Sequence, residues 1–304
     1  MWLRDSANQL QSYKPILKSK GGKDPKANIA ALYRGTINLQ ARYIQKYPYC
    51  NAFQPPPESG IPPVNHRKRS TIRRDTVNPP YDPSEVWECK YELDSVSAFL
   101  QLSWDYYDAT RDDKFFSKFQ WSKAIKSILD MATGMMEGTY AADGSVNKSP
   151  YTWFRDANTA TEVVSNKGAG NPVEGHIGLV RSFFRPSDDS TIYQYFIPAN
   201  MMFARNLRTC AIIMAQVGDA QLARRMEAMA SGIYQAIDKY AITNHPKFGK
   251  IYAYEVDGLG SFNLMVSQNP TYIFFVLKLT KPRMMPMSPL FSVSPILVTR
   301  TSPL

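Results

Sequence analysis

The chain has 304 residues, of which 44% are hydrophobic and 20% charged, and its formal net charge is +10. These proportions are ordinary for a globular protein, and the longest apolar run, Tyr272 to Leu279, is too short to cross a bilayer. Much of the positive excess is local, so we expect neither a nucleic-acid partner nor a membrane segment in this chain. The local excess lies in the tail after residue 265 and in one loop, at Arg67, Lys68, Arg69, Arg73 and Arg74.

The three cysteines exclude a zinc site, because they show neither a CxxC pair nor a metal-ligand spacing. Cys50 and Cys89 flank a loop and could pair in an oxidising compartment, whereas Cys210 lies on an apolar helical stripe and is expected in the core. Glycine-rich nucleotide motifs are also absent from the sequence. We therefore expect no metal and no cofactor. The first residues contain no apolar stretch that would serve as a signal peptide, and the localisation stays unknown.

Helical periodicity dominates the chain and strand alternation is scarce. Asp24 and Pro25 mark the start of the first predicted helix, Asp94 or Ser95 caps the second, and Asp219 caps the last. The last two helices are joined by about two residues and should form an antiparallel hairpin. The predicted helices span, in order, residues 24–47, 95–107, 115–136, 203–217 and 219–240.

Two long loops separate these helices, and loops of such length are uncommon in compact domains unless they are functional or disordered. Residues 48–86 are rich in proline, arginine and asparagine, and we expect a flexible surface insertion there. Residues 143–197 are rich in aromatic and carboxylate side chains, as expected for a site. Helical hairpins joined by short turns and long polar loops favour an all-α toroid with the long loops gathered over one end.

The most distinctive motif in the second loop is a pair of adjacent carboxylates, Asp188 and Asp189, which follow Arg185 and precede Tyr193 and Tyr195. Glycoside hydrolysis requires one carboxylic acid that stays protonated. Burial among aromatic rings and a like-charged neighbour both raise a carboxyl pKa in that direction. The alternative is structural, because two aspartates ahead of a helix can also cap its N-terminus.

Other polar residues are candidates for sugar binding. Arg4 and Asp5 follow Trp2, and a similar aromatic–apolar–Arg–Asp pattern begins at Trp153. Arginine–carboxylate pairs beside an aromatic ring can fix sugar hydroxyls by charge-assisted hydrogen bonds, although a structural ion pair is the simpler role. His176 lies between glycines and is expected outside the core. Glu88, Glu92 and Asp94 surround Tyr91 at a helix start, where we expect them to act as caps.

Five segments together resemble glycoside hydrolase family 125, the exo-α-1,6-mannosidases, and in particular its fungal members. The resemblance covers residues 1–265 and implies an incomplete (α/α)6 barrel, metal-independent hydrolysis with inversion, and release of α-1,6-linked mannose from non-reducing ends. The segments are Trp2-Leu3-Arg4-Asp5-Ser6, Tyr91-Glu92-Leu93-Asp94-Ser95, Phe184-Arg185-Pro186-Ser187-Asp188-Asp189, Ile197-Pro198-Ala199-Asn200-Met201 and Tyr254-Glu255-Val256-Asp257-Gly258-Leu259-Gly260.

The resemblance also assigns roles to these residues. The general acid is Asp188 or Asp189, with Asp188 preferred, and Arg4 and Asp5 line the subsite for the terminal mannose. Arg185 and Asn200 support that subsite, and His176 and Trp153 complete the set of candidate substrate-binding residues.

Two parts of the family pattern are missing. A Thr-Gly-Asp-Ile-Pro stretch is absent upstream of Trp2, and the His-Glu-Ser-Phe motif that supplies the general base is absent altogether. Residues 266–304 contain six prolines, four basic residues and no acidic one, and we expect a disordered tail outside the family domain.

We therefore predict a monomeric α-mannosidase-like protein that recognises α-1,6-linked manno-oligosaccharides or N-glycans but lacks turnover. The alternatives are a carbohydrate-binding remnant and a basic helical scaffold.

Overall fold

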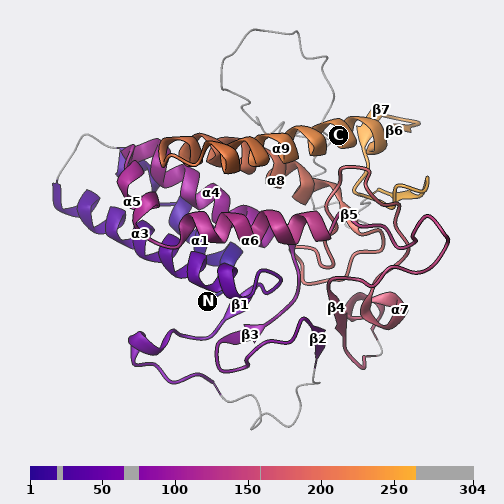
Figure 1. Cartoon of the computed structure of the whole chain (residues 1–304), viewed down its shortest axis with the longest axis horizontal. Coiled ribbons are helices and arrows are strands. Elements are labelled where there is room, and N and C mark those ends of the chain that lie inside the picture. The colour runs from indigo at the N-terminus through magenta and orange to yellow at the C-terminus, as the bar shows by residue number, and fades with distance from the viewer. Residues whose placement is uncertain (19–22, 65–74, 158, 265–304) are drawn as a thin grey trace, which may run out of the picture.

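The computed structural model describes residues 1–18, 23–64, 75–157 and 159–264 (Figure 1). Within these residues the protein is rich in helix, and short strands lie in the loops between the helices. The predicted tail over 266–304 and the basic loop around Arg69 lie outside the described residues. Among the helices that are described, none combines the length and the apolar character that a bilayer span requires.

Helix α4 (Leu93–Thr110) lies at the centre of the packed helices, which we call the helical layer. It packs against α1 (Leu3–Gln11), α2 (Lys14–Lys18), α3 (Lys23–Lys46) and α8 (Ile197–Gln216). Most of its side chains are buried, on all sides of the helix, as expected for a helix enclosed by others. The first turns of α1 and α4 lie next to each other, because Arg4 in α1 bonds Glu92 and Asp94 at the start of α4.

Helices α8 and α9 (Ala220–Tyr240) form the hairpin that the sequence predicts, and they pack along each other. The side chain of Asp219 accepts a hydrogen bond from the backbone N–H of Leu222 at 2.9 Å, which confirms the predicted N-cap. Helix α8 begins six residues earlier than residue 203, because Pro198 in its first turn suits a helix start.

Two predicted helix boundaries are wrong. The helix expected over 115–136 is divided into α5 (Asp113–Lys118) and α6 (Trp121–Gly134), because Phe119 adopts an extended conformation with φ −125° and ψ −148°. Helix α4 begins at Leu93 with Glu92 at the N-cap, so neither Asp94 nor Ser95 is the cap.

Short strands of two to four residues pair antiparallel within the loops, which a fold predicted without strands did not include. They are too short for alternation to be visible in the sequence. The pairs are β1 (Ala52–Phe53) with β3 (Val86–Glu88), β2 (Thr76–Asn78) with β4 (Thr152–Phe154), β6 (Ile242–His245) with β7 (Gly249–Tyr252), and β8 (Glu255–Val256) with both β5 (Tyr195–Phe196) and β9 (Phe262–Asn263).

The segment 48–86, predicted as a flexible insertion, contains regular structure on both sides of residues 65–74. Strands β1 and β3 pair, the short 3-10 helix η1 (Pro57–Ser59) follows β1, and Asn51 to Gln54 are buried. A disulfide joins Cys50 to Cys89, which confirms the predicted pair, and Cys210 is buried as expected.

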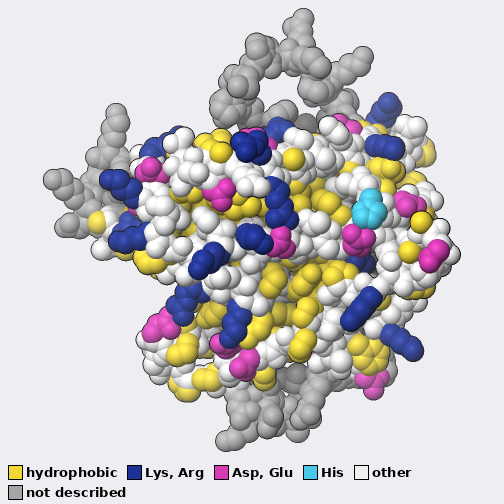
Figure 2. Space-filling view, viewed as in Figure 1, with side chains coloured by type: hydrophobic (Ala, Val, Ile, Leu, Met, Phe, Trp, Pro, Cys, Tyr) yellow, Lys and Arg dark blue, Asp and Glu magenta, His cyan; other side chains and the backbone are white. Residues whose placement is uncertain are grey.

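The long connection between α6 and α8 gathers with β4–β7 at one end of the helical layer, on the right in Figure 1. It contains η3 (Ala160–Glu162) and α7 (Ser165–Gly168). Figure 2 shows lysine and arginine side chains scattered among aspartate and glutamate over this face.

Candidate active site

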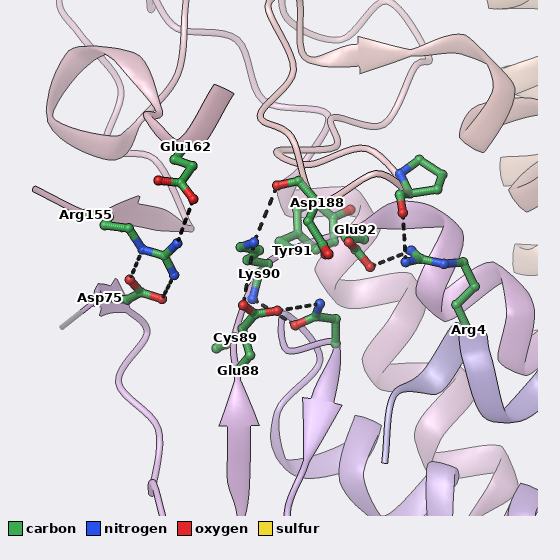
Figure 3. Close-up of polar contacts among 12 residues, drawn as sticks. Arg4, Asp75, Glu88, Cys89, Lys90, Tyr91, Glu92, Arg155, Glu162 and Asp188 are labelled. Carbon is green, nitrogen blue, oxygen red and sulfur yellow. Dashed lines mark hydrogen bonds and ion pairs between the residues drawn. The ribbon is translucent and has the colours of Figure 1, made fainter. Parts of the chain in front are cut away.

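Arg4, in the first turn of α1, links three segments that are far apart in the sequence (Figure 3). Its Nη1 donates to Glu92 Oε2 at 2.7 Å and to Asp94 Oδ2 at 2.9 Å, and its Nη2 donates to the Pro186 carbonyl at 3.1 Å. Burial alone would lower the pKa of the Arg4 guanidinium, but the two carboxylates outweigh it and raise the pKa. One arginine therefore holds the start of α4 next to the 184–190 loop.

Glu92 and Asp94 form a buried carboxylate pair, exposed by only 2% and 1%. Burial and, next, the charge of Asp94 raise the pKa of Glu92 to about 8, and burial also raises the pKa of Asp94. Glu92 Oε2 accepts from Arg4 and from Ser95 Oγ, the latter at 2.7 Å. A proton on Glu92 is therefore expected on the other oxygen, Oε1.

Each of these carboxyl groups also has one oxygen that, within the described part of the chain, accepts and donates no hydrogen bond. Among the residues that the structure describes, Glu92 Oε1 and Asp94 Oδ1 have no hydrogen-bond partner although both atoms are buried. Eight other buried side-chain atoms of the described residues, Tyr91 Oη and Arg181 Nε among them, also lack a partner, and the two carboxyl oxygens differ in belonging to groups bound by Arg4. A protonated Glu92 offers a donor here and Asp94 an acceptor, which is the combination that sugar hydroxyls can satisfy.

Asp188 lies at the tip of a tight turn beside this pair (Figure 3). Its backbone N–H donates to the Arg185 carbonyl at 2.9 Å, and its φ of 67° is left-handed, a conformation that aspartate tolerates better than most residues. Lys90 Nζ donates to the Asp188 carbonyl at 3.4 Å from below. The Asp188 side chain is exposed, and its charge adds a further, smaller contribution to the raised pKa values of Glu92 and Asp94.

The capping role that was the alternative for the aspartate pair does not apply to α8. That helix begins at Ile197, its N-cap is Phe196, and no side chain caps it. Asp189 instead accepts a hydrogen bond from Ser187 Oγ at 3.1 Å, inside the same turn. The two aspartates are therefore part of the loop that faces Arg4 rather than part of a helix end.

Arg185 and Asp5 are neighbours in sequence of the residues of this group, whereas Asn200 and Trp153 are buried and contact other residues. Arg185 Nε is paired with Glu255 Oε1 at 2.6 Å, and Asp5 is exposed on α1. Asn200 is fully buried, and its amide bonds the backbone N–H and carbonyl of Val180 at 2.9 Å. The fully buried state of Asn200 and Trp153 favours a supporting role over direct contact with a sugar.

Trp153 and Arg155 make their contacts outside the group formed by Arg4, Glu92, Asp94 and Asp188, which we call the Arg4 group. The Trp153 ring packs edge-on against Phe184, with ring centroids 4.9 Å apart. Arg155 forms a bidentate pair with Asp75, at 2.6 and 2.9 Å, which ties β4 to the residue before β2 (Figure 3). The arginine of the second aromatic–apolar–Arg–Asp pattern therefore makes a structural ion pair.

His176 is separate from the Arg4 group in its contacts. Its side chain is 72% exposed, and Nε2 lies 3.2 Å from Glu137 Oε2, just beyond the end of α6. Among the described residues, no group of three or more His, Cys, Asp or Glu side chains has an arrangement suited to a metal ion. An open surface hollow of about 500 Å³ between α3 and α6 is lined by Arg42, Gln45, Lys46, Gln120 and Lys123, and it contains none of the candidate residues.

The sequence missed the partners of Arg4. Glu92 and Asp94 were expected to cap α4, yet neither forms a capping bond, and both face Arg4 instead. The signal was present in their spacing, because carboxylates at i and i+2 that straddle a helix start cannot both cap it. Lys90 and Glu255 gave no such signal, since their partners lie 98 and 70 residues away.

Paired carboxyl groups held in the loops of a helical framework are the groups that glycoside hydrolases use, and this class is compatible with the arrangement described above. The comparison with known families supports that class and specifies it. The chain belongs to the metal-independent α-mannosidases of family GH125, whose family model matches residues 1–271. The match therefore extends past residue 265, the end of the domain predicted from the sequence.

Two relatives agree with this family. The chain is 41% identical over 269 residues to the Meiotically up-regulated gene 157 protein of Schizosaccharomyces pombe, covering 88% of this chain and 50% of that protein. The structure of the present chain is similar to that of a metal-independent α-mannosidase of Streptococcus pneumoniae, which was solved in a non-productive complex with α-1,6-mannobiose. The TM-score is 0.71 at 30% identity, over 86% of this chain and 56% of that one. The chain thus spans about half the length of these relatives.

Proposed function

We propose that this chain binds the non-reducing terminal mannose of α-1,6-linked manno-oligosaccharides, as an inverting exo-α-1,6-mannosidase would, but does not hydrolyse them. The observation that carries the proposal is a pair of carboxyl oxygens without a hydrogen-bond partner among the described residues, Glu92 Oε1 and Asp94 Oδ1. Arg4 binds both carboxyl groups and also the turn that contains Asp188. The α-1,6-mannobiose in the structure of the pneumococcal relative supports this choice of ligand.

In this proposal Asp188 is the general acid that protonates the leaving oxygen, and Asp189 is the alternative. Inversion also requires a second carboxylate, about 6.5–9.5 Å away, that activates a water molecule on the opposite face of the sugar. Adjacent aspartates do not fit that geometry. Glu92, Asp94 and Glu255 each already bind an arginine, and the 304 residues contain no His-Glu-Ser-Phe motif. We infer that this polypeptide lacks a general base.

The test measures binding and turnover on the same folded sample. The chain is purified, its helical content is checked by circular dichroism, and α-1,6-mannobiose is titrated while changes in the protein's NMR spectrum are followed. We expect saturable binding that is weaker for α-1,2- and α-1,3-mannobiose, and no release of mannose. Equal affinity for all three disaccharides would contradict the specificity, and release of mannose with inverted configuration would reveal a base.

The acid assignment needs a protein that can turn over. A chimera of residues 1–264 with the C-terminal part of the fission-yeast relative provides the matched background. In it, Asp188→Asn should lower the hydrolysis rate roughly 10²–10⁴-fold, the usual contribution of general acid catalysis, without loss of disaccharide binding. Asp189→Asn is the control and should keep most of the rate, and the reverse pattern would move the acid by one residue.

A further inference from the structure

The turn that carries the two candidate acids is closed by backbone bonds, from Arg185 N–H to the Asp189 carbonyl and from Thr191 N–H to the Phe183 carbonyl, and one buried carboxylate, that of Glu255, also bonds both of its ends. Glu255 Oε1 accepts from Arg185 Nε at 2.6 Å, where the turn begins. Its other oxygen, Oε2, accepts from the backbone N–H groups of Ile192 and Tyr193 at 3.0 and 3.1 Å, where the turn ends. A single side chain on β8 therefore bonds both ends of residues 185–193, in addition to the backbone bonds across the turn.

A second element holds the Glu255 carboxylate itself in place. Asn263, the partner of Glu255 in the β8–β9 pairing, donates from Nδ2 to Oε2 at 2.7 Å. Four N–H donors thus converge on this side chain, which is fully buried. Only an ionised carboxylate offers acceptors to all four, because an amide in the same place would turn its own N–H₂ toward donors on one side.

The contacts of the turn itself show why its base matters. Near the end of the turn, Ser190 donates to the carbonyls of Thr161 and Val163. At its tip, residues 186–189, the described hydrogen bonds with other elements are two, from Arg4 to the Pro186 carbonyl and the longer bond from Lys90 to the Asp188 carbonyl. Both go to backbone oxygens, so neither fixes the Asp188 side chain. Asp188 also keeps a left-handed φ of 67°, which the surrounding structure has to impose.

We propose that Glu255 is a positioning residue, which sets the geometry of the 185–193 turn and thereby holds Asp188 against the Glu92–Asp94 pair. It acts through Arg185 and the backbone and does not touch the sugar. The inference rests on the proposed function, because it assigns to Glu255 the placement of the mannoside site described above.

The variant that tests this inference is Glu255→Gln in the chain as it exists, with Asp257→Asn as the matched control. Asp257 lies two residues further along the same segment, and its Oδ1 accepts from the backbone N–H groups of Leu259 and Ser261 at 2.8 and 2.9 Å. An asparagine can still accept both bonds, so the control makes the same chemical change without opening the turn. Glu255→Asp, which keeps the charge but shortens the reach, is the second variant in case Glu255→Gln does not fold.

Two readouts are taken on each folded variant, namely backbone amide exchange and α-1,6-mannobiose affinity by NMR titration. In Glu255→Gln we expect exchange at Ile192 and Tyr193 to accelerate at least about tenfold, with α8 and α9 unchanged, because bonds to a charged acceptor are lost locally. We expect mannobiose affinity to fall about tenfold as well, which corresponds to the loss of one such interaction. Glu255→Asp should move both readouts in the same direction by a smaller factor, and Asp257→Asn should move neither.

Several results would overturn the inference. If exchange accelerates equally over the helices, or if Asp257→Asn behaves like Glu255→Gln, then Glu255 supports the fold in general. Local acceleration with unchanged affinity would mean that the turn geometry does not matter for the ligand. If the unmodified chain does not bind mannobiose at all, the proposed function fails. The exchange at Ile192 and Tyr193 then still decides whether Glu255 holds the turn.

Discussion

The helical layer and the loop end of this protein are held together in different ways. In the layer around α4, large apolar side chains such as Phe99, Phe203 and Leu207 are fully buried and pack between neighbouring helices. At the loop end, single polar side chains join segments that are about 70 to 100 residues apart, as Arg4, Lys90 and Glu255 do. Apolar packing distributes the contacts of each side chain over many neighbours, whereas each polar contact depends on one particular pair of residues.

The largest expected effect comes from the helical layer. Phe203→Ala removes a fully buried ring from α8 and should lower the free energy of unfolding by about 3–5 kcal/mol, because a cavity is left between the helices. Urea denaturation followed by circular dichroism measures this. Met202→Ala, at the neighbouring exposed position, is the control and should cost much less. Similar costs at both positions would mean that α8 is not packed as described.

At the loop end, Arg4→Met should destabilise the protein by about 3 kcal/mol at neutral pH, because it leaves two buried carboxyl groups without their cation. The cost should shrink in acid, where Asp94 also takes up a proton and the pair no longer needs a cation. Denaturation midpoints at pH 5 and pH 7.5 check this. Arg4→Lys keeps the charge and should lose less, and a cost for Arg4→Met that does not depend on pH would separate Arg4 from these carboxylates.

Another effect concerns pH alone. The pKa of Glu92 is about 8 in the folded protein against an ordinary 4.5, so the folded state binds the extra proton between these values. Stability should therefore fall as the pH rises from about 4.5 to about 8. Glu92→Gln removes this titration and should flatten most of the slope between these two pH values.

Thermal midpoints over that pH range measure the slope, and Glu227→Gln, at an exposed position on α9, is the control. If Glu92→Gln keeps the full slope, the pH dependence arises elsewhere in the protein.

The smallest expected effect is at a surface ion pair of the helical layer. Lys126 and Asp130 lie one turn apart on α6, with Nζ and Oδ2 2.7 Å apart, and both are exposed. Such pairs contribute little in water, so Lys126→Ala should change the free energy of unfolding by less than about 0.5 kcal/mol. A loss close to that of Arg4→Met would remove the distinction between buried and exposed ion pairs on which the comparison depends.

The same distinction explains how far the sequence could predict this protein. The α8–α9 hairpin and its Asp219 cap follow from apolar periodicity and a local capping residue, and both are confirmed. The break at Phe119 could not be foreseen, because the apolar stripe continues through it and only the backbone changes direction.

The candidate site was predictable as a set of motifs but not as a set of contacts. The motifs around Arg4, Glu92 and Asp188 are visible in the sequence, and the structure brings them together. Which residues pair, however, depends on the packing of α1 on α4, and no local pattern encodes it. Burial is likewise not encoded locally: Asn200, predicted to support the subsite, and Trp153, predicted to bind substrate, are both fully buried.

The disulfide between Cys50 and Cys89 has a consequence for protease mapping. The bond closes a covalent ring, because the two cysteines are 39 residues apart in the sequence. A protease that cuts once at any peptide bond between residues 50 and 89 would open this ring without separating the two fragments. The products would migrate as one species on a non-reducing gel and as two after addition of thiol. Because Arg4 and Glu92 lie on opposite fragments, a cleaved molecule would keep both halves of the mannoside site on one covalent unit until it was reduced.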